Sequence, residues 1–123
     1  MIQLSSDYVY HNQCNRPLIE SDPTHPQSVY AQTKLDGDLA VLDQCQNSLV
    51  IRTSWVYSSF GHNFVKTMIR LGTEREELRI VFDQVGTPTY AFDLAEAMLQ
   101  IVDQFEQGTH AVSYTHLTLP TKA

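Results

Sequence analysis

The chain has 123 residues, 42% of them hydrophobic, and a formal net charge of −6 at pH 7. This length allows at most one domain, and the acidic balance argues against a nucleic-acid or anionic-membrane partner, because no basic stripe is present to neutralise phosphates. The two cysteines, Cys14 and Cys45, form no C-x-x-C pair and the start "MIQLSSDYVY" is unlike a signal peptide, so we expect a cytoplasmic protein with no zinc site and no membrane partner.

Hydrophobic patterning predicts three strands that alternate with three helices. A buried strand at residues 2–6 is followed by a polar, turn-rich loop and by a helix over residues 26–45 that begins at Pro26. "SLVIRTSWVY" indicates a second buried strand at 48–54, and "NFVKTMIRLG" indicates a helix at 62–71 closed by Gly72. "ELRIVF" predicts a strand at 78–82, and "YAFDLAEAMLQIVDQF" a helix at 91–106. This order predicts an α/β fold with a parallel sheet.

The end of the chain differs from the rest. "VSYTHLTLPTK", residues 112–122, has no acidic residue and resembles one reading frame of a transposon-end adaptor used to build sequencing libraries. We therefore expect residues 1–110 to form the native part and residues 111–123 to be a non-native tail that packs poorly. The alternative is a genuine strand with a Thr-Leu-Thr-Leu alternation.

Two residues one helical turn apart could carry chemistry. In "SVYAQTKLDGD", Tyr30 and Lys34 lie four residues apart on the predicted helix, where side chains at this spacing are neighbours. An ammonium beside a phenol favours the phenolate, which lets the tyrosine exchange a proton with a carbonyl or alcohol oxygen. An ordinary exposed helix face would show the same spacing.

A hydroxyl that holds the same oxygen would complete such a site. Ser6 falls at the end of the first predicted strand, where doubly wound sheets place their ligands. The alternative is that its hydroxyl only caps the strand end.

Four motifs in order resemble one known family. "SSDYVY", "PLIESDPTHPQSVYAQTKLDGD", "VIRTSWVYSSFGHNFVKTMIRLG" and "DQVGTPTYAFDLAEAM" are similar to segments of the dTDP-4-dehydrorhamnose reductases, members of the extended short-chain dehydrogenase/reductase superfamily. The resemblance is collinear over about residues 2–110. It implies a partial Rossmann-like parallel sheet with flanking helices and the reduction of dTDP-4-dehydro-β-L-rhamnose to dTDP-β-L-rhamnose with NADPH or NADH. It leaves open the choice of cofactor, a Mg²⁺ ion and a homodimeric parent.

The resemblance also implies roles for the three residues considered above. Tyr30 would be the general acid that protonates the sugar C4 oxygen. Lys34 would favour ionisation of Tyr30 and hydrogen-bond the nicotinamide ribose, so both residues would contact the cofactor. Ser6, where the family often has threonine, would hold the keto oxygen.

Further positions match residues that bind the nucleotide-sugar substrate in the family. Asp7 and Trp55 would line the sugar site, with the indole offering a flat face to the deoxyhexose. Asn63 and Lys66 are weaker candidates for the nucleotide-sugar side. For Trp55 the alternative is plain core packing.

The sequence also departs from the family pattern. Ala31 and Asn12 stand where glycines are usual, and no Gly-x-x-Gly-x-x-Gly loop for the cofactor pyrophosphate occurs in the chain. We therefore expect a fragment without the N-terminal third and the C-terminal end, inactive alone, with apolar faces of the first strand and of the Tyr30 helix exposed. Two alternatives remain: another nucleotide-sugar epimerase or dehydratase, and a non-catalytic protein like the regulatory subunit of methionine adenosyltransferase.

Overall fold

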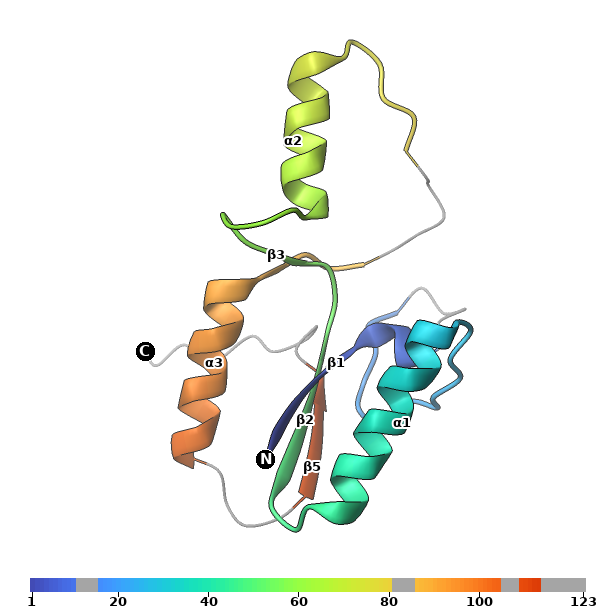
Figure 1. The fold of residues 1–123 in the computed structure, drawn as a ribbon, viewed down its shortest axis with the longest axis vertical. Helices are drawn as coiled ribbons and strands as arrows, with labels where there is room; N and C mark the ends of the chain where they lie inside the picture. Colours follow the sequence, from blue (N-terminus) through green and yellow to red (C-terminus); the bar gives the residue numbers. More distant parts are fainter. Residues whose placement is uncertain (11–15, 81–85, 105–108, 114–123) are drawn as a thin grey trace.

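A computed structural model of the chain describes residues 1–10, 16–80, 86–104 and 109–113 (Figure 1). Helices and strands alternate along most of it. In chain order they are β1 (Ile2–Ser6), the 3-10 helix η1 (Asp7–Val9), α1 (Val29–Gln44), β2 (Ser48–Thr53), β3 (Val56–Tyr57), α2 (Phe64–Glu74), β4 (Thr89–Tyr90), α3 (Ala91–Gln104) and β5 (Thr109–Ser113). None of the helices in these segments is long and apolar enough to cross a membrane.

The main sheet has three parallel strands in the order β1-β2-β5. β3 and β4 form a second, short parallel pair. Helix α1 lies against one face of the main sheet and α3 against the other, while α2 extends away from it (Figure 1). The predicted α/β fold with a parallel sheet and flanking helices is therefore confirmed.

Strand β2 is the centre of the packing, and all six of its residues are buried. Leu49 and Ile51 pack with Leu94 of α3, joined by partly buried side chains on the same face. Arg52 points to the other face, where its guanidinium bonds to Asp38 of α1. This alternation is the period of two expected of a strand covered on both sides.

Most predicted elements are confirmed, with shifted ends. α1 starts after Ser28, whose hydroxyl oxygen accepts a hydrogen bond from the Ala31 amide at 3.1 Å, so the prediction that Pro26 opens the helix is wrong. The prediction that Gly72 ends the second helix is also wrong, because α2 continues through it to Glu74. Asn12 and residues 105–106 of the predicted last helix lie outside the described residues.

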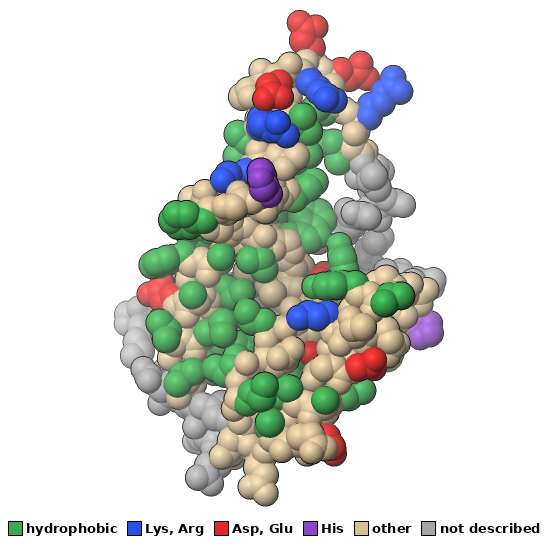
Figure 2. Space-filling model, in the orientation of Figure 1, with side chains coloured by type: hydrophobic (Ala, Val, Ile, Leu, Met, Phe, Trp, Pro, Cys, Tyr) green, Lys and Arg blue, Asp and Glu red, His purple; other side chains and the backbone are tan. Residues whose placement is uncertain are grey.

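The predicted strand at 78–82 is wrong where it can be checked. Residues 78–80 have no regular secondary structure, and residues 81–82 lie outside the described residues. Charged side chains gather around this segment and the end of α2 (Figure 2), where Glu74, Arg75, Glu76 and Glu77 are exposed. The segment runs beside α2, far from the main sheet (Figure 1), so it has no ladder partner to hold it as a strand.

The predicted tail begins inside a strand. The backbone of residues 111–113 continues β5, with Val112 opposite Ile51 and Ser113 opposite Arg52 of β2. Residues 114–123 lie outside the described residues. The non-native origin of the tail stays a prediction.

Apolar side chains are exposed on the first strand and on the Tyr30 helix, as predicted. Leu4 of β1 is 42% exposed, and Val29 and Leu39 of α1 are 83% and 55% exposed. Further exposed hydrophobic side chains lie on α3, among them Phe92 and Leu99. Hydrophobic side chains are visible at the surface in Figure 2, which has the orientation of Figure 1.

Candidate functional site

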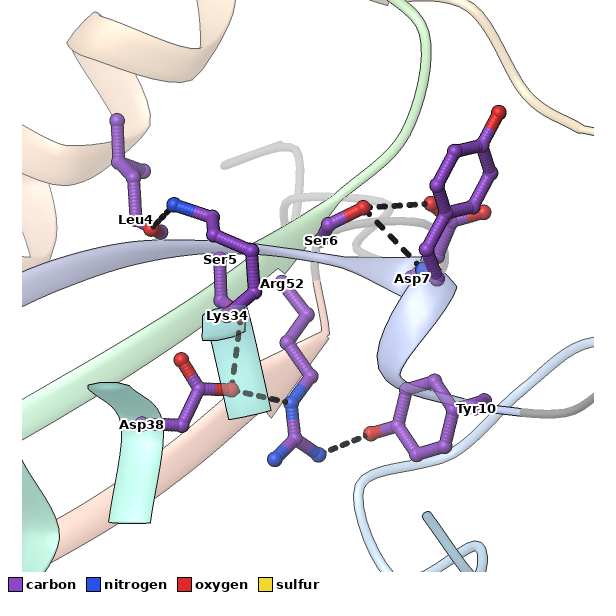
Figure 3. Close-up of polar contacts among 9 residues, drawn as sticks. Leu4, Ser5, Ser6, Asp7, Tyr10, Lys34, Asp38 and Arg52 are labelled. Carbon is purple, nitrogen blue, oxygen red and sulfur yellow. Dashed lines mark hydrogen bonds and ion pairs between the residues drawn. The ribbon is translucent and has the colours of Figure 1, made fainter. Parts of the chain in front are cut away.

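Ser6 ends β1, and its hydroxyl is held by its neighbours. The backbone there is extended, and the Ser6 oxygen accepts a hydrogen bond from the Tyr8 amide at 3.2 Å, which caps η1. The same hydroxyl lies 3.4 Å from Asp7 Oδ1, to which it donates a long hydrogen bond (Figure 3). Ser6 thus makes the strand-end cap that was the alternative expectation for its hydroxyl.

Lys34 reaches back from α1 to β1. Its Nζ donates a hydrogen bond to the Leu4 carbonyl oxygen at 2.9 Å (Figure 3). Leu4 is two residues before Ser6, so the ammonium lies beside the strand that carries the serine.

Tyr30 lies one helical turn before Lys34 on α1. Its ring packs edge-on against the ring of Tyr8, with centroids 6.3 Å apart and planes at 85°. Tyr8 is two residues after Ser6, and Tyr30 is 55% exposed. The structure therefore brings Tyr30 and Lys34 against the end of β1 and leaves the phenol open to a ligand.

Asp7 follows Ser6 in the half-buried turn at the end of β1. Burial raises the pKa of its carboxyl above the ordinary value, and hydrogen bonds from Ser6 and from backbone amides offset this only in part. At neutral pH, the ionised carboxylate of Asp7 therefore lowers the stability of the folded chain.

Trp55 marks the point where two distant motifs meet. It follows β2 with a φ of +44°, a left-handed conformation that is uncommon for a bulky residue. Its carbonyl oxygen accepts the Thr89 amide at 3.2 Å, its ring packs 5.3 Å from that of Phe64, and Gly86 lies against its indole. "RTSW" and the described part of the later motif, "GTPT" at 86–89, are thus adjacent in space.

Asn63 and Lys66 shape the turn before α2. Asn63 caps the helix, because its Oδ1 accepts the Lys66 amide at 3.0 Å while its Nδ2 donates to the Ser58 carbonyl at 2.8 Å. Lys66 Nζ donates to the carbonyls of Ser59 and Gly61, both at 2.9 Å. The hydrogen bonds described for their side chains are all within this turn.

The sequence reasoning missed a buried polar cluster that contains Ser5, Tyr10, Asp38 and Arg52. Two signals could have indicated it. Arg52 is a charge in a strand otherwise of the buried type, and Asp38 lies one turn after Lys34 on the same helix. In the segments the structure describes, no group of three or more His, Cys, Asp or Glu side chains could hold a metal ion.

Together, the fold and the site define a Rossmann-like α/β protein with a serine at a strand end and a tyrosine–lysine pair on the helix beside it. The chain belongs to the family described as "RmlD substrate binding domain", which matches residues 1–122. The resemblance to the dTDP-4-dehydrorhamnose reductases is thereby confirmed.

Named relatives agree with this family. A dTDP-4-dehydrorhamnose reductase of Escherichia coli (strain K12) is 48% identical over 96 residues, which cover 78% of this chain and 32% of the relative. The structure of a dTDP-4-dehydrorhamnose reductase from Clostridium acetobutylicum superimposes with a TM-score of 0.81 at 44% identity, over 89% of this chain and 39% of that one. That of the Bacillus anthracis enzyme in complex with NADP gives 0.77 at 40% identity, over 91% and 40%. The chain spans about a third of the length of the curated relatives it matches.

Proposed function

We propose that this chain is the part of a dTDP-4-dehydrorhamnose reductase that carries the proton donor and one side of the sugar site. The reaction reduces the C4 keto group of dTDP-4-dehydro-β-L-rhamnose to dTDP-β-L-rhamnose. The observation that supports the proposal is that Lys34 bonds to Leu4 and Tyr30 packs on Tyr8, the residues two before and two after Ser6, in a chain of this family.

Tyr30 donates the proton that the C4 oxygen needs. Its exposed phenol can reach a ligand at the end of β1, and Lys34 lies one turn further along the same helix. The Ser6 hydroxyl turns from Asp7 toward the keto oxygen and holds it beside the phenol. Tyr30 thus protonates the oxygen atom that Ser6 binds.

A nicotinamide cofactor, NADPH or NADH, fits this arrangement and supplies the hydride. Lys34 is the residue that would bind its ribose, and the exposed face of Tyr30 would lie beside it. Relatives that carry the reductase name, one of them in complex with NADP, support this choice over the epimerase, dehydratase and regulatory alternatives. Mg²⁺ is not part of the proposal, and a homodimeric parent and a cytoplasmic location stay predictions.

Trp55 and Asp7 line the sugar side in this proposal. The left-handed backbone of Trp55 supports a binding role, because bulky residues keep such conformations mainly where function requires them. Asn63 and Lys66 remain candidates for the nucleotide side, although their side chains already shape the turn before α2.

A chimera tests the proposal. This chain replaces the matching segment of the Escherichia coli relative, and NADPH consumption is followed with dTDP-4-dehydro-β-L-rhamnose generated in situ. We expect reductase activity, and a Tyr30→Phe variant should lose roughly 10² or more in kcat with little change in KM, because only the proton donor is removed. The matched control is Tyr90→Phe, which removes a phenol hydroxyl from β4.

Two results would contradict the proposal. An inactive chimera that nevertheless folds and binds NADPH would show that this segment does not supply a reductase site. Wild-type turnover in the Tyr30→Phe chimera would show that Tyr30 is not the acid.

A further inference from the structure

An ion pair is buried between α1 and β2. Asp38 is 0% exposed and Arg52 is 5% exposed, and Arg52 Nε donates to Asp38 Oδ2 at 3.1 Å. Charges in such surroundings are costly unless they are paired and hydrogen-bonded. These two residues therefore fix each other's position strongly.

Two further side chains extend the pair in opposite directions. The Ser5 hydroxyl of β1 donates to Asp38 Oδ2 at 2.8 Å, and Arg52 Nη1 donates to the Tyr10 hydroxyl at 2.6 Å (Figure 3). The Arg52 guanidinium also lies 4.9 Å from the centre of the Tyr10 ring. The cluster thus joins α1, both neighbouring strands and the segment after η1.

The cluster lies next to the proposed active site along two elements. On α1, Asp38 follows Lys34 by one turn and Tyr30 by two, so all three are near one helix face. On β1, Ser5 lies between Leu4 and Ser6. The Leu4 carbonyl oxygen accepts the hydrogen bond from Lys34, and the Ser5 hydroxyl bonds to Asp38. α1 is therefore fastened to β1 at two successive points, Leu4 and Ser5.

Two fastening points define both the rotation of α1 and its position along β1. A single contact would allow the helix to roll or slide, which would move the Tyr30 hydroxyl relative to Ser6. Displacements of about 1 Å between reacting groups can cost on the order of 10²-fold in rate. The Asp38 bond to Ser5 is the contact that removes this freedom.

The cluster is not built for stability alone. Asp38 Oδ1 is buried and has no hydrogen-bond partner among the described residues, which costs free energy. Apolar residues of similar volume in place of a buried ion pair are often as stable or more so. Directional hydrogen bonds that lower stability are expected of residues whose role is to hold other residues in position.

We propose that Asp38 and Arg52 are positioning residues, which hold Tyr30 and Lys34 of α1 in register with Ser6 of β1. Asp38 sets the register through Ser5, and Arg52 holds the Asp38 carboxylate from the far side. The effect on turnover rests on the proposed function, whereas the effect on geometry does not.

The geometric part is tested on the full chain by NMR. Cross-relaxation between the Tyr8 and Tyr30 ring protons reports the contact at the end of β1. In Asp38→Asn we expect this signal to fall at least twofold, and in Asp38→Glu, which keeps the carboxylate, to be restored. The matched control is Asp36→Asn, because Asp36 is an exposed carboxylate on the same helix, bonded only to Gln32 among the contacts described for it.

The turnover part is tested in the chimera, with kcat expressed per NADPH-binding site. We expect Asp38→Asn to lower kcat about tenfold to a hundredfold with KM within twofold, and Asp38→Glu to recover it. If Asp38→Asn fails to fold, the double variant Asp38→Leu/Arg52→Met replaces it. We expect that variant to fold and yet to show the same loss of kcat and of the ring signal.

The outcomes separate the two proposals. A folded variant without the Asp38–Arg52 pair that keeps the wild-type ring signal overturns the positioning role. One that keeps the wild-type kcat in an active chimera overturns the effect of the pair on turnover. An unmodified chimera without reductase activity contradicts the proposed function, and the NMR comparison then decides the positioning role by itself.

Discussion

A methyl group added at Gly86 should disturb Trp55. A Cβ built at Gly86 would lie 2.5 Å from Trp55 Cε2, 2.7 Å from Nε1 and 2.9 Å from Cζ2. Carbon atoms in contact normally stay about 3.5–4.0 Å apart, so the indole must shift by an ångström or so or the turn must open. Gly86→Ala therefore forces apart the two motifs that meet at this point.

The indole has little room to give way. Its ring packs against Phe64, and the Trp55 backbone is fixed by its bond to the Thr89 amide and by its left-handed φ. Overpacking of this kind typically costs about 1–3 kcal/mol, and we expect Gly86→Ala to lower the free energy of unfolding by that amount. The matched control is Gly72→Ala inside α2, where a Cβ meets no atom within 4 Å. That change should stabilise the chain by roughly 0.5–1 kcal/mol, because alanine favours a helix over glycine.

Urea unfolding of the full chain followed by circular dichroism measures both effects. Trp55 is the only tryptophan, so the fluorescence of the folded chain reports its surroundings directly. We expect the emission to shift in Gly86→Ala and to stay unchanged in Gly72→Ala. A Gly86→Ala chain with wild-type stability and wild-type emission would refute the close approach of Gly86 to the indole.

Three more predictions concern the residues around the site. Ser28→Ala removes the cap of α1 and should cost about 1 kcal/mol of unfolding free energy in urea titrations; an unchanged midpoint would argue against the cap. Burial raises the pKa of Asp7 above about 3.8, so its ionised form destabilises the folded chain at neutral pH, while below that pH both states are protonated and the cost vanishes. Asp7→Asn should therefore stabilise the chain at pH 7 and lose this gain by pH 3, and an equal gain at both pH values would contradict the assignment. In the chimera, Ser6→Thr should keep turnover because it keeps the hydroxyl, whereas Ser6→Ala should lower kcat; equal turnover in both would remove Ser6 from the site.

The sequence predicts those parts of the fold that depend on short-range patterns. The apolar run at residues 49–51 of β2 and the spacing of apolar residues along the helices can be recognised without knowledge of their neighbours. The predicted strand at 78–82 fails for the opposite reason, because a strand exists only where a partner strand is available. The prediction that Gly72 ends the second helix fails for another reason. A glycine in an exposed helix interior lowers stability without ending the helix.

The site was predictable only in part. Tyr30, Lys34 and Ser6 follow from motifs and their roles stay predictions, while the structure adds that Tyr30 packs on Tyr8 and that Lys34 bonds to Leu4. The sequence marks Arg52 and Asp38 as unusual charges, but their pairing depends on how α1 is rotated against β2, which no spacing along the chain encodes. Roles at the nucleotide side remain predictions, since Asn63 and Lys66 are engaged within their own turn.

The parallel order of the sheet also has a consequence for how the chain folds. Ile2 pairs with Leu49 across α1, and Ser48 pairs with Thr109 across α2 and α3, so each ladder joins residues far apart in the sequence. A long loop must close before the first hydrogen bond between such strands can form. The entropy lost in closing the loop slows folding. α1 needs only contacts within itself and its cap, so it can form before the strands on either side of it meet. We therefore expect slow folding in which a transient α1 precedes the sheet, and the geometry around Tyr30 to be among the last features to appear.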